Sequence, residues 1–177
     1  MFHGLRMKVE VRKVDKGELK EFYEMQQTYL DIENSATFFK NLGAFPDLYL
    51  GAFEGRKLVG IAYAGLRNEG IYLRGICVDL GGGYQRLGIG SLLLKAFEKA
   101  VSCRGQRKLS VGSAPDPKVE KFYIKNGYAP IEIVVKSKDT EFLTKKVSGY
   151  DEGRCLKESM KRELGAEEAI FIFEKAL

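Results

Sequence analysis

Apolar runs separated by short polar or glycine-containing segments organise most of this chain. Residues 7–14 alternate apolar and polar side chains, the pattern of a half-buried strand. Three longer runs predict consecutive strands at residues 48–53, 57–66 and 71–80, joined by hairpin-like turns. Three more strands are predicted further along, at residues 107–112, 128–136 and 169–176.

Helical spacing of apolar residues separates these strands. Long apolar faces predict helices over residues 19–30 and 89–103, and Asp15 with Glu18 resembles a capping box before the first of them. Shorter helices are predicted at residues 35–41, 117–125 and 153–164. This order of elements predicts an α/β (mixed α+β) fold, with a central mixed, twisted sheet of about seven strands and helices on both faces.

The length of 177 residues predicts a single domain over residues 1–177, with an extra helical insertion at about 138–165 before the last strand. No apolar run reaches the roughly 18 residues that a membrane-spanning helix needs, and the first residues lack the apolar core of a signal peptide. Three cysteines with no CxxC spacing favour a reducing compartment over disulfides or zinc. We therefore expect a cytoplasmic protein with no membrane partner.

The single histidine, His3, lies at the start of the chain. A Ser-His-Asp or Cys-His arrangement needs a histidine within the fold, and a metal site built from imidazoles needs several, so we expect neither. The net charge of +5 suits an anionic ligand, but the basic residues are scattered and mixed with acids. We do not expect nucleic-acid binding.

The most distinctive segment is GGGYQRLGIGS, residues 81–91, between a predicted strand and a predicted helix. The first N–H groups of a helix lack internal partners, and glycines let an anion approach them closely. A nucleotide P-loop is excluded because Ile89 stands where the lysine should be. A dinucleotide motif is excluded because Arg86 and Leu93 occupy its third glycine position in the two possible registers. A plain glycine-rich turn remains the alternative.

Residues 85–90, QRLGIG, match the pattern [QR]-x-x-G-x-[GA], and KFYIKNGY at residues 121–128 follows downstream. With this order of strands and helices, the chain resembles the GNAT superfamily of N-acetyltransferases. The resemblance implies an enzyme that uses acetyl-CoA as cosubstrate and no metal. It moves the acetyl group to a primary amine of a protein or small molecule by direct attack in a ternary complex.

The resemblance also implies roles for particular residues. The backbone of residues 85–91 would hold the pyrophosphate, and an N–H of residues 76–78 would face the thioester oxygen. Tyr123 would be the general acid that protonates the leaving thiolate, although an aromatic residue on that helical face also suits a core. The positions implied for cofactor binding are Ile76, Cys77, Val78, Gln85, Arg86, Leu87, Gly88, Ile89, Gly90, Ser91, Asp116, Phe122, Tyr123 and Lys125.

The chain departs from the family pattern at two points. Asp116 stands where an asparagine is common in the family. Arg74-Gly75 occupies the strand position where many members have a glutamate or aspartate that acts as general base. Glu33, Glu69 and Asp79 are candidate substitutes, although each also suits a surface charge or cap. The amine could instead lose its proton through water. A non-catalytic CoA or acyl-CoA sensor or docking module is therefore the alternative function.

Cys77 and the insertion at about 138–165 each allow two interpretations from the sequence. Cys77 could carry an acyl group, but with no histidine nearby a small buried side chain fits better. The insertion at about 138–165 could cover the acceptor site or form a homodimer contact. The identity of the acceptor amine does not follow from the sequence.

Overall fold

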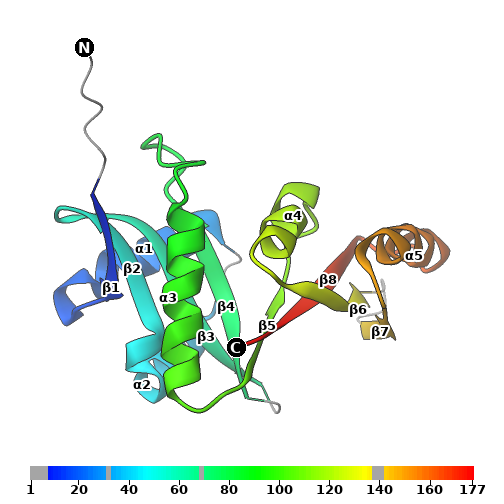
Figure 1. The fold of residues 1–177 in the computed structure, drawn as a ribbon, viewed down its shortest axis with the longest axis horizontal. Coiled ribbons are helices and arrows are strands. Elements are labelled where there is room, and N and C mark those ends of the chain that lie inside the picture. The colour runs from blue at the N-terminus through cyan, green and yellow to red at the C-terminus, as the bar shows by residue number, and fades with distance from the viewer. Residues whose placement is uncertain (1–7, 31–32, 68–69, 137–141) are drawn as a thin grey trace. The chain divides into compact units, whose positions relative to one another are not determined.

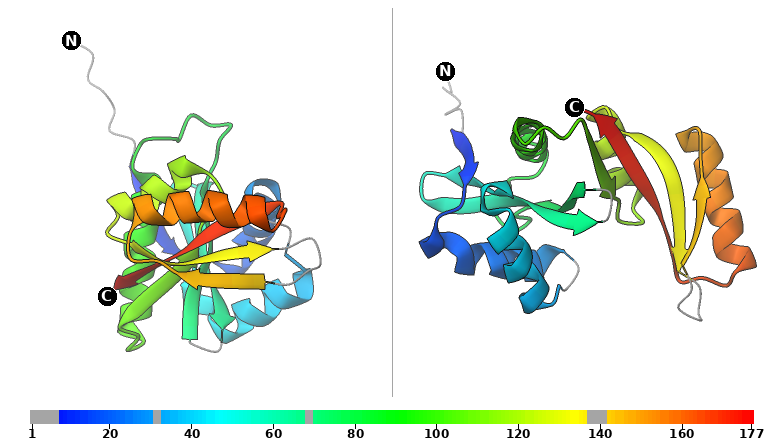
Figure 2. Two further views of the ribbon diagram at one scale, coloured as in Figure 1. Left: turned by 90° about the vertical axis from the view of Figure 1, so that its right-hand side faces the viewer. Right: turned by 90° about the horizontal axis from the view of Figure 1, so that it is seen from below.

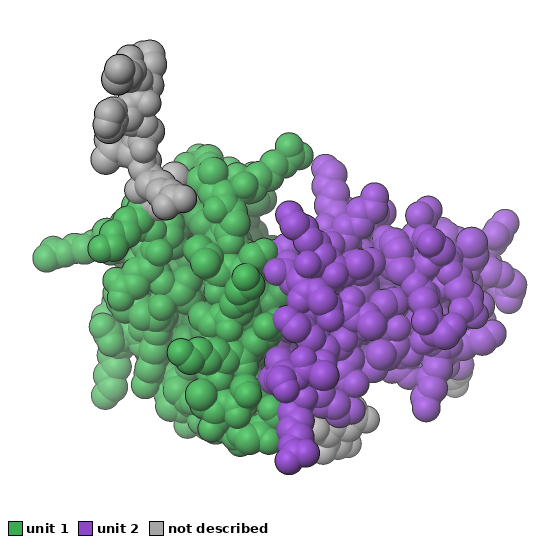
Figure 3. All heavy atoms as spheres, in the orientation of Figure 1, with its two compact units in different colours: residues 1–106 green, residues 107–177 purple. Residues whose placement is uncertain are grey.

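The computed structural model describes residues 8–30, 33–67, 70–136 and 142–177. His3, Met7 and Glu69 lie outside these residues, as do residues 138–141 of the expected insertion. The chain divides into two compact units, residues 1–106 and residues 107–177, which have separate colours in Figure 3.

The first unit contains four strands, ordered β1-β2-β3-β4 and paired antiparallel throughout. They are β1 (Val9–Lys13), β2 (Tyr49–Glu54), β3 (Lys57–Arg67) and β4 (Gly70–Val78) (Figure 1). The central pair has long apolar runs because β2 and β3 are buried along most of their length. The predicted strands at residues 48–53, 57–66 and 71–80 are confirmed to within a few residues.

Helices cover both faces of these strands. The 3₁₀ turn Lys16–Glu18 leads into α1 (Leu19–Tyr29), and α2 (Ser35–Ala44) is followed by a second 3₁₀ turn, Pro46–Leu48. Figure 2 shows α1 and α2 on one face and α3 (Ile89–Cys103) on the other. The predicted capping box is present, since the Glu18 carboxylate accepts the Asp15 backbone N–H at 2.8 Å.

The core under α1 and α2 is aromatic. Four fully buried rings, those of Phe22, Phe38, Tyr49 and Tyr63, lie with their centroids 5.3–6.0 Å apart. Rings at such distances gain contact energy beyond the area they bury. Phe22 of α1 and Phe38 of α2 therefore serve packing.

The second unit contains β5 (Lys108–Gly112), β6 (Ala129–Lys136), β7 (Phe142–Lys146) and β8 (Glu168–Ala176). Their order is β5-β8-β6-β7, again with antiparallel pairs. The described residues thus hold eight strands, one more than the seven predicted. The additional strand is β7, a short edge strand whose sequence FLTKK lacks a long apolar run.

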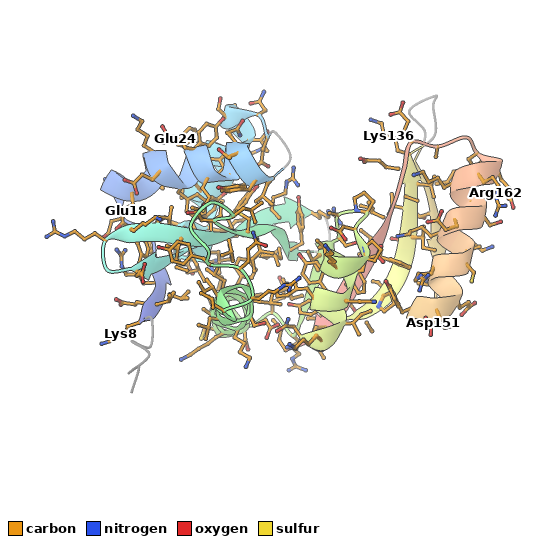
Figure 4. The ribbon with its side chains drawn as sticks, turned by 90° about the horizontal axis from the view of Figure 1, so that it is seen from above. Lys8, Glu18, Glu24, Lys136, Asp151 and Arg162 are labelled. Atoms are coloured by element: carbon orange, nitrogen blue, oxygen red, sulfur yellow. The ribbon has the colours of Figure 1, made fainter. Side chains whose placement is uncertain are left out.

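Two helices pack on the strands of this unit. α4 (Pro117–Lys125) contacts β6, and α5 (Tyr150–Glu163) contacts β6 and β8. Asp151 and Arg162, labelled in Figure 4, lie in the first and last turns of α5. A negative charge at the N-terminus and a positive charge at the C-terminus of a helix both interact favourably with the helix dipole. α5 is the helix predicted in the insertion, but its buried residues are Gly153 and Lys157. The apolar residues that recur along this helix, Leu156, Met160 and Leu164, are only half-buried.

No helix within the described ranges is long and apolar enough to cross a membrane.

Candidate functional site

The glycine-rich segment joins β4 to α3 through several backbone conformations of positive φ. Gly83 has a φ of 73°, Arg86 of 60° and Gly88 of 81°. Gly88 is the N-cap of α3 and has no side chain with which to cap the first turn, which also contains no acidic residue. The first N–H groups of α3 are therefore left to solvent or to a ligand, and the helix dipole favours an anion there.

Asp79 fastens the start of this segment. Its Oδ1 accepts the Tyr29 hydroxyl at 2.8 Å and the Gly81 backbone N–H at 3.0 Å, and Lys57 Nζ lies 3.7 Å from Oδ2. These partners stabilise the carboxylate, so the hydrogen bond from Tyr29, followed by that from Gly81, lowers the pKa of Asp79. Asp79 thus serves as a loop anchor, and its oxygens are engaged with protein groups.

Tyr84 fastens the middle of the segment. Its side chain is buried, its hydroxyl donates to Glu54 Oε2 at 2.7 Å, and Lys57 Nζ lies 4.8 Å from the ring centroid. A Cβ at Gly82 would lie 2.1 Å from Tyr84 Cε2. Glycine is therefore required at position 82 so that the backbone can pass over the fastened ring. Neither this role of Tyr84 nor that of Gly82 was predicted from the sequence.

The end of β4 carries the residues expected to face the thioester. Ile76, Cys77 and Val78 are half-buried and pair with Ala62, Ile61 and Gly60 of β3. Burial raises the pKa of the Cys77 thiol to about 12, so the thiol stays protonated at neutral pH. Since the thiolate is the reactive form, these surroundings do not support Cys77 as an acyl-carrying nucleophile.

The middle of β4 carries Arg74, the residue found where the family often has an acid. The register with β3 shifts here, with Tyr63 opposite Gly75 and Ala64 opposite Leu73, so Arg74 is the extra residue of a bulge. Arg74 Nε donates to Glu33 Oε1 at 3.3 Å. The Glu33 side chain is only 6% exposed. Its second oxygen, Oε2, is buried and accepts no hydrogen bond within the described part of the chain.

Gly75 explains why the chain before α2 can lie so close to β4. A Cβ at Gly75 would lie 2.6 Å from Tyr63 Cε1 and 2.7 Å from Leu30 Cδ1. Leu30 is the C-cap of α1, three residues before Glu33. The absence of a side chain at position 75 therefore admits Leu30 against the strand, beside the point where Arg74 binds Glu33.

The remaining expected residues belong to the second unit. Asp116 is the N-cap of α4, and its Oδ1 accepts the Lys118 backbone N–H at 2.8 Å. Tyr123 is 4% exposed, with ring centroids of Tyr128 and Phe173 within 5.8 Å of its own. Burial raises the pKa of Tyr123 well above its ordinary value, which keeps the phenol protonated. On the same helix, Phe122 is half-buried and Lys125 is exposed.

A buried polar network supports α4 from the inserted helix. Glu120 is fully buried one turn before Tyr123, and both of its oxygens accept hydrogen bonds from α5. The donors are the Tyr150 hydroxyl, at 2.6 Å, and the Lys157 ammonium. The sequence gives little signal for this network, because a lysine and a glutamate on helices ordinarily indicate exposed positions.

The expected site residues are divided between the two units. Residues 85–88 form an exposed turn, and residues 89–91 begin α3 with Ile89 buried. Both follow residues 76–78 of β4 within the first unit. The expected residues of α4 lie in the second unit. No group of three or more His, Cys, Asp or Glu side chains that could hold a metal ion was found among the described residues.

The chain is similar to proteins of one known family. A family model described as the acetyltransferase (GNAT) domain matches residues 16–147. No curated protein matches the chain.

Several solved structures share the fold. Ard1 from Thermoplasma volcanium aligns with a TM-score of 0.68 and 14% identity, covering 96% of this chain and 97% of that one. The ribosomal-protein-S18-alanine N-acetyltransferase of Escherichia coli gives 0.65 and 17%, covering 96% and 94%. Arabidopsis thaliana Naa50, solved with the bisubstrate analogue CoA-Ac-MVNAL, gives 0.64 and 15%, covering 96% and 99%. At these identities the likeness shows the fold alone.

Proposed function

This chain belongs to the GNAT acetyltransferase family, and from that membership we propose that it is an acetyl-CoA-dependent N-acetyltransferase. It would move an acetyl group to a primary amine of a protein or small molecule by direct attack in a ternary complex. The observation that carries the proposal is the turn after β4, where Arg86 and Gly88 have positive φ and the uncapped start of α3 follows directly. Such a turn presents backbone N–H groups to an anion.

In the proposed complex, the backbone of residues 85–91 holds the pyrophosphate of acetyl-CoA. The anchors at Asp79 and Tyr84 support this role, because a loop fastened at two points loses less conformational entropy when it binds. The pantetheine arm follows residues 76–78, where a backbone N–H polarises the thioester carbonyl. Asp116, Phe122 and Lys125 of the second unit are proposed as further cofactor contacts, on the family resemblance.

The reaction needs a neutral amine and a proton for the leaving sulfur. The amine lone pair attacks the carbonyl carbon, a C–N bond forms, and the C–S bond breaks with its electrons on sulfur. The nitrogen releases one proton to water, and water returns a proton to the donor that protonates the sulfur. Tyr123 is proposed to give the sulfur its proton. Burial raises the pKa of Tyr123, which keeps the phenol protonated but also makes it a weaker acid, so this role rests on the family resemblance.

The proposal specifies a primary amine as the acceptor and does not specify the rest of the acceptor molecule. Among the structural neighbours, Naa50 was solved with an analogue carrying the peptide MVNAL, and the NatC complex with Gag peptide and CoA. Another neighbour is a mosquito arylalkylamine N-acetyltransferase-like protein. A panel should therefore contain peptides with free N-termini, arylalkylamines and polyamines.

The first test is thermal unfolding with acetyl-CoA, CoA, ATP and NAD in parallel. A ligand at about 100 times its dissociation constant adds ~2.7 kcal/mol, which shifts Tm by roughly 5–10 °C for a chain of this size. A shift with acetyl-CoA and CoA alone supports the cofactor site, and its absence refutes it. Release of free CoA thiol with the amine panel then separates an enzyme from the alternative, a non-catalytic CoA-binding module.

A further inference from the structure

One carboxylate oxygen of Glu33 receives no hydrogen bond from the described residues. Its side chain is 6% exposed, Oε1 is bound by Arg74, and Oε2 is buried without a donor. An unpartnered oxygen on a buried charged group is costly, so such an atom usually marks the place of a ligand or an ordered water. The question is which donor fits this one.

The surroundings of Glu33 limit the charge of that donor. Arg74 neutralises the carboxylate, and the buried tyrosines Tyr49 and Tyr63 lie near enough to feel its charge. The pair of Glu33 and Arg74 therefore carries no net charge. A second cation placed against it would be repelled by Arg74 at short range in a poorly solvated site. A neutral N–H donor meets the need of Oε2 without that repulsion.

The place of the pair along β4 connects it to the reaction. Arg74 lies two residues before Ile76, where the thioester-holding segment is proposed to start, and a strand advances about 3.3 Å per residue. The family often supplies a carboxylate from this part of the strand. Here the strand supplies Arg74 and Gly75 instead, and the carboxylate comes from the segment before α2.

We propose that Glu33 Oε2 accepts an N–H hydrogen bond from the neutral primary amine of the acceptor. Arg74 is the positioning residue that holds the carboxylate in place. The bond orients the nitrogen so that its lone pair remains free for attack, and the neutral pair selects the unprotonated amine. This inference rests on the proposed N-acetyltransferase function and assigns the residue that recognises its acceptor.

The test compares Glu33→Gln and Glu33→Asp with the wild type, using the amine of the panel that the wild type acetylates fastest. Gln keeps the shape and loses the charge, and Asp keeps the charge and withdraws the oxygen by one methylene. Loss of a hydrogen bond to a charged group should lower kcat/KM for the amine by about 10–100-fold. The dissociation constant of acetyl-CoA, followed by thermal shift, should remain within about twofold of the wild type, because the proposed cofactor contacts are untouched.

Glu18→Gln is the matched control. Glu18 is also an arginine-paired carboxylate, with its Oε1 2.6 Å from Arg12 Nη2, but it closes the capping box before α1 and has no proposed role in the reaction. It should leave kcat/KM for the amine unchanged. A second readout separates recognition from a general loss of structure. With CoA present and no acetyl donor, the amine should raise the Tm of the wild type and not that of Glu33→Gln.

The possible outcomes bear differently on the two proposals. If the wild type acetylates the amine and both Glu33 variants keep kcat/KM within about threefold, Oε2 has some other partner, such as water, and the inference fails alone. A wild type that binds acetyl-CoA and acetylates no amine refutes the transferase function, and the inference falls with it. Losses in both variants at unchanged acetyl-CoA affinity support the inference.

Discussion

Lys157 of α5 donates a hydrogen bond to Glu120 of α4, and both side chains are almost completely buried. The Lys157 ammonium also lies 4.8 Å from the ring centroid of Phe171, while the Tyr150 hydroxyl occupies the other Glu120 oxygen. The inserted helix is thereby tied to the helix that carries Tyr123. Gly153 lets α5 lie close, since a Cβ there would be 2.6 Å from Phe171 Cε1.

Lys157→Met should destabilise the protein strongly. Methionine fills a similar volume, but it leaves Glu120 as a buried charge without its cation. Removing one partner of a buried pair typically costs about 3–5 kcal/mol, so the urea midpoint should fall sharply. Lys121→Met is the control, because Lys121 lies at an exposed position of α4, next to Glu120. It should change the free energy of unfolding by less than ~0.5 kcal/mol. Equal midpoints for the two variants would show that the pair is dispensable.

Gly82→Ala should weaken both folding and acetyl-CoA binding. The new methyl group would lie 2.1 Å from Tyr84 Cε2, and the ring is fastened by its hydrogen bond to Glu54. Overpacking of this kind costs about 1–3 kcal/mol. The neighbouring Gly81→Ala is the control, because the nearest atom to its Cβ is Asp79 Oδ1 at 3.6 Å. Thermal unfolding with and without acetyl-CoA measures both effects, and similar losses in the two variants would contradict the role given to Tyr84.

Gly88→Ala and Gly90→Ala should behave differently although they lie in the same motif. Gly88 has a φ of 81°, a conformation that costs alanine about 1–2 kcal/mol. Gly90 lies inside α3, where alanine is the better helix former by up to ~1 kcal/mol, and the family motif accepts alanine there. We expect weaker acetyl-CoA binding and a lower Tm for Gly88→Ala alone. Comparable acetyl-CoA affinities would indicate that the turn at Gly88 does not shape the site.

The sequence predicted those parts of the molecule whose signal is local. The glycine-rich turn before α3, the apolar face of α3 and the helix predicted at residues 117–125 each depend on residues close together in the sequence, and each has the predicted secondary structure. The resemblance to the family was likewise readable from two short motifs. β7 was missed because FLTKK is a short edge strand with two lysines.

The parts that were missed depend on contacts between distant segments. Glu33 is separated from Arg74 by 41 positions and Lys157 from Glu120 by 37, so no periodicity reveals either pair. Their residue types also argue for exposure when they are read singly. Glu33 was considered as a substitute for the absent acid, but only its burial against Arg74 distinguishes it from Asp79, whose oxygens are occupied.

Stability should fall as the pH rises above about 8.5. Burial raises the pKa of Tyr49 and Tyr63, and raises that of Cys77 to about 12, whereas in the unfolded chain the thiol titrates near ~8.5 and the phenols near ~10. Unfolding therefore releases protons at alkaline pH, and each such group weakens the fold by up to ~1.4 kcal/mol per pH unit until its folded pKa is reached. Urea unfolding at pH 8 and pH 10.5 tests this. A midpoint that stays level or rises would contradict it.

Tyr123→Phe separates the two roles open to Tyr123. If the hydroxyl protonates the leaving sulfur, its loss should lower kcat by about 10²–10⁴-fold with little change in the dissociation constant of acetyl-CoA. If the ring only packs against Tyr128 and Phe173, phenylalanine preserves those contacts and kcat should hardly change. Tyr128→Phe, at a neighbouring buried ring, controls for loss of a hydroxyl from this core. The raised pKa of Tyr123 adds a second expectation, since its deprotonation should not limit the wild-type rate below about pH 10.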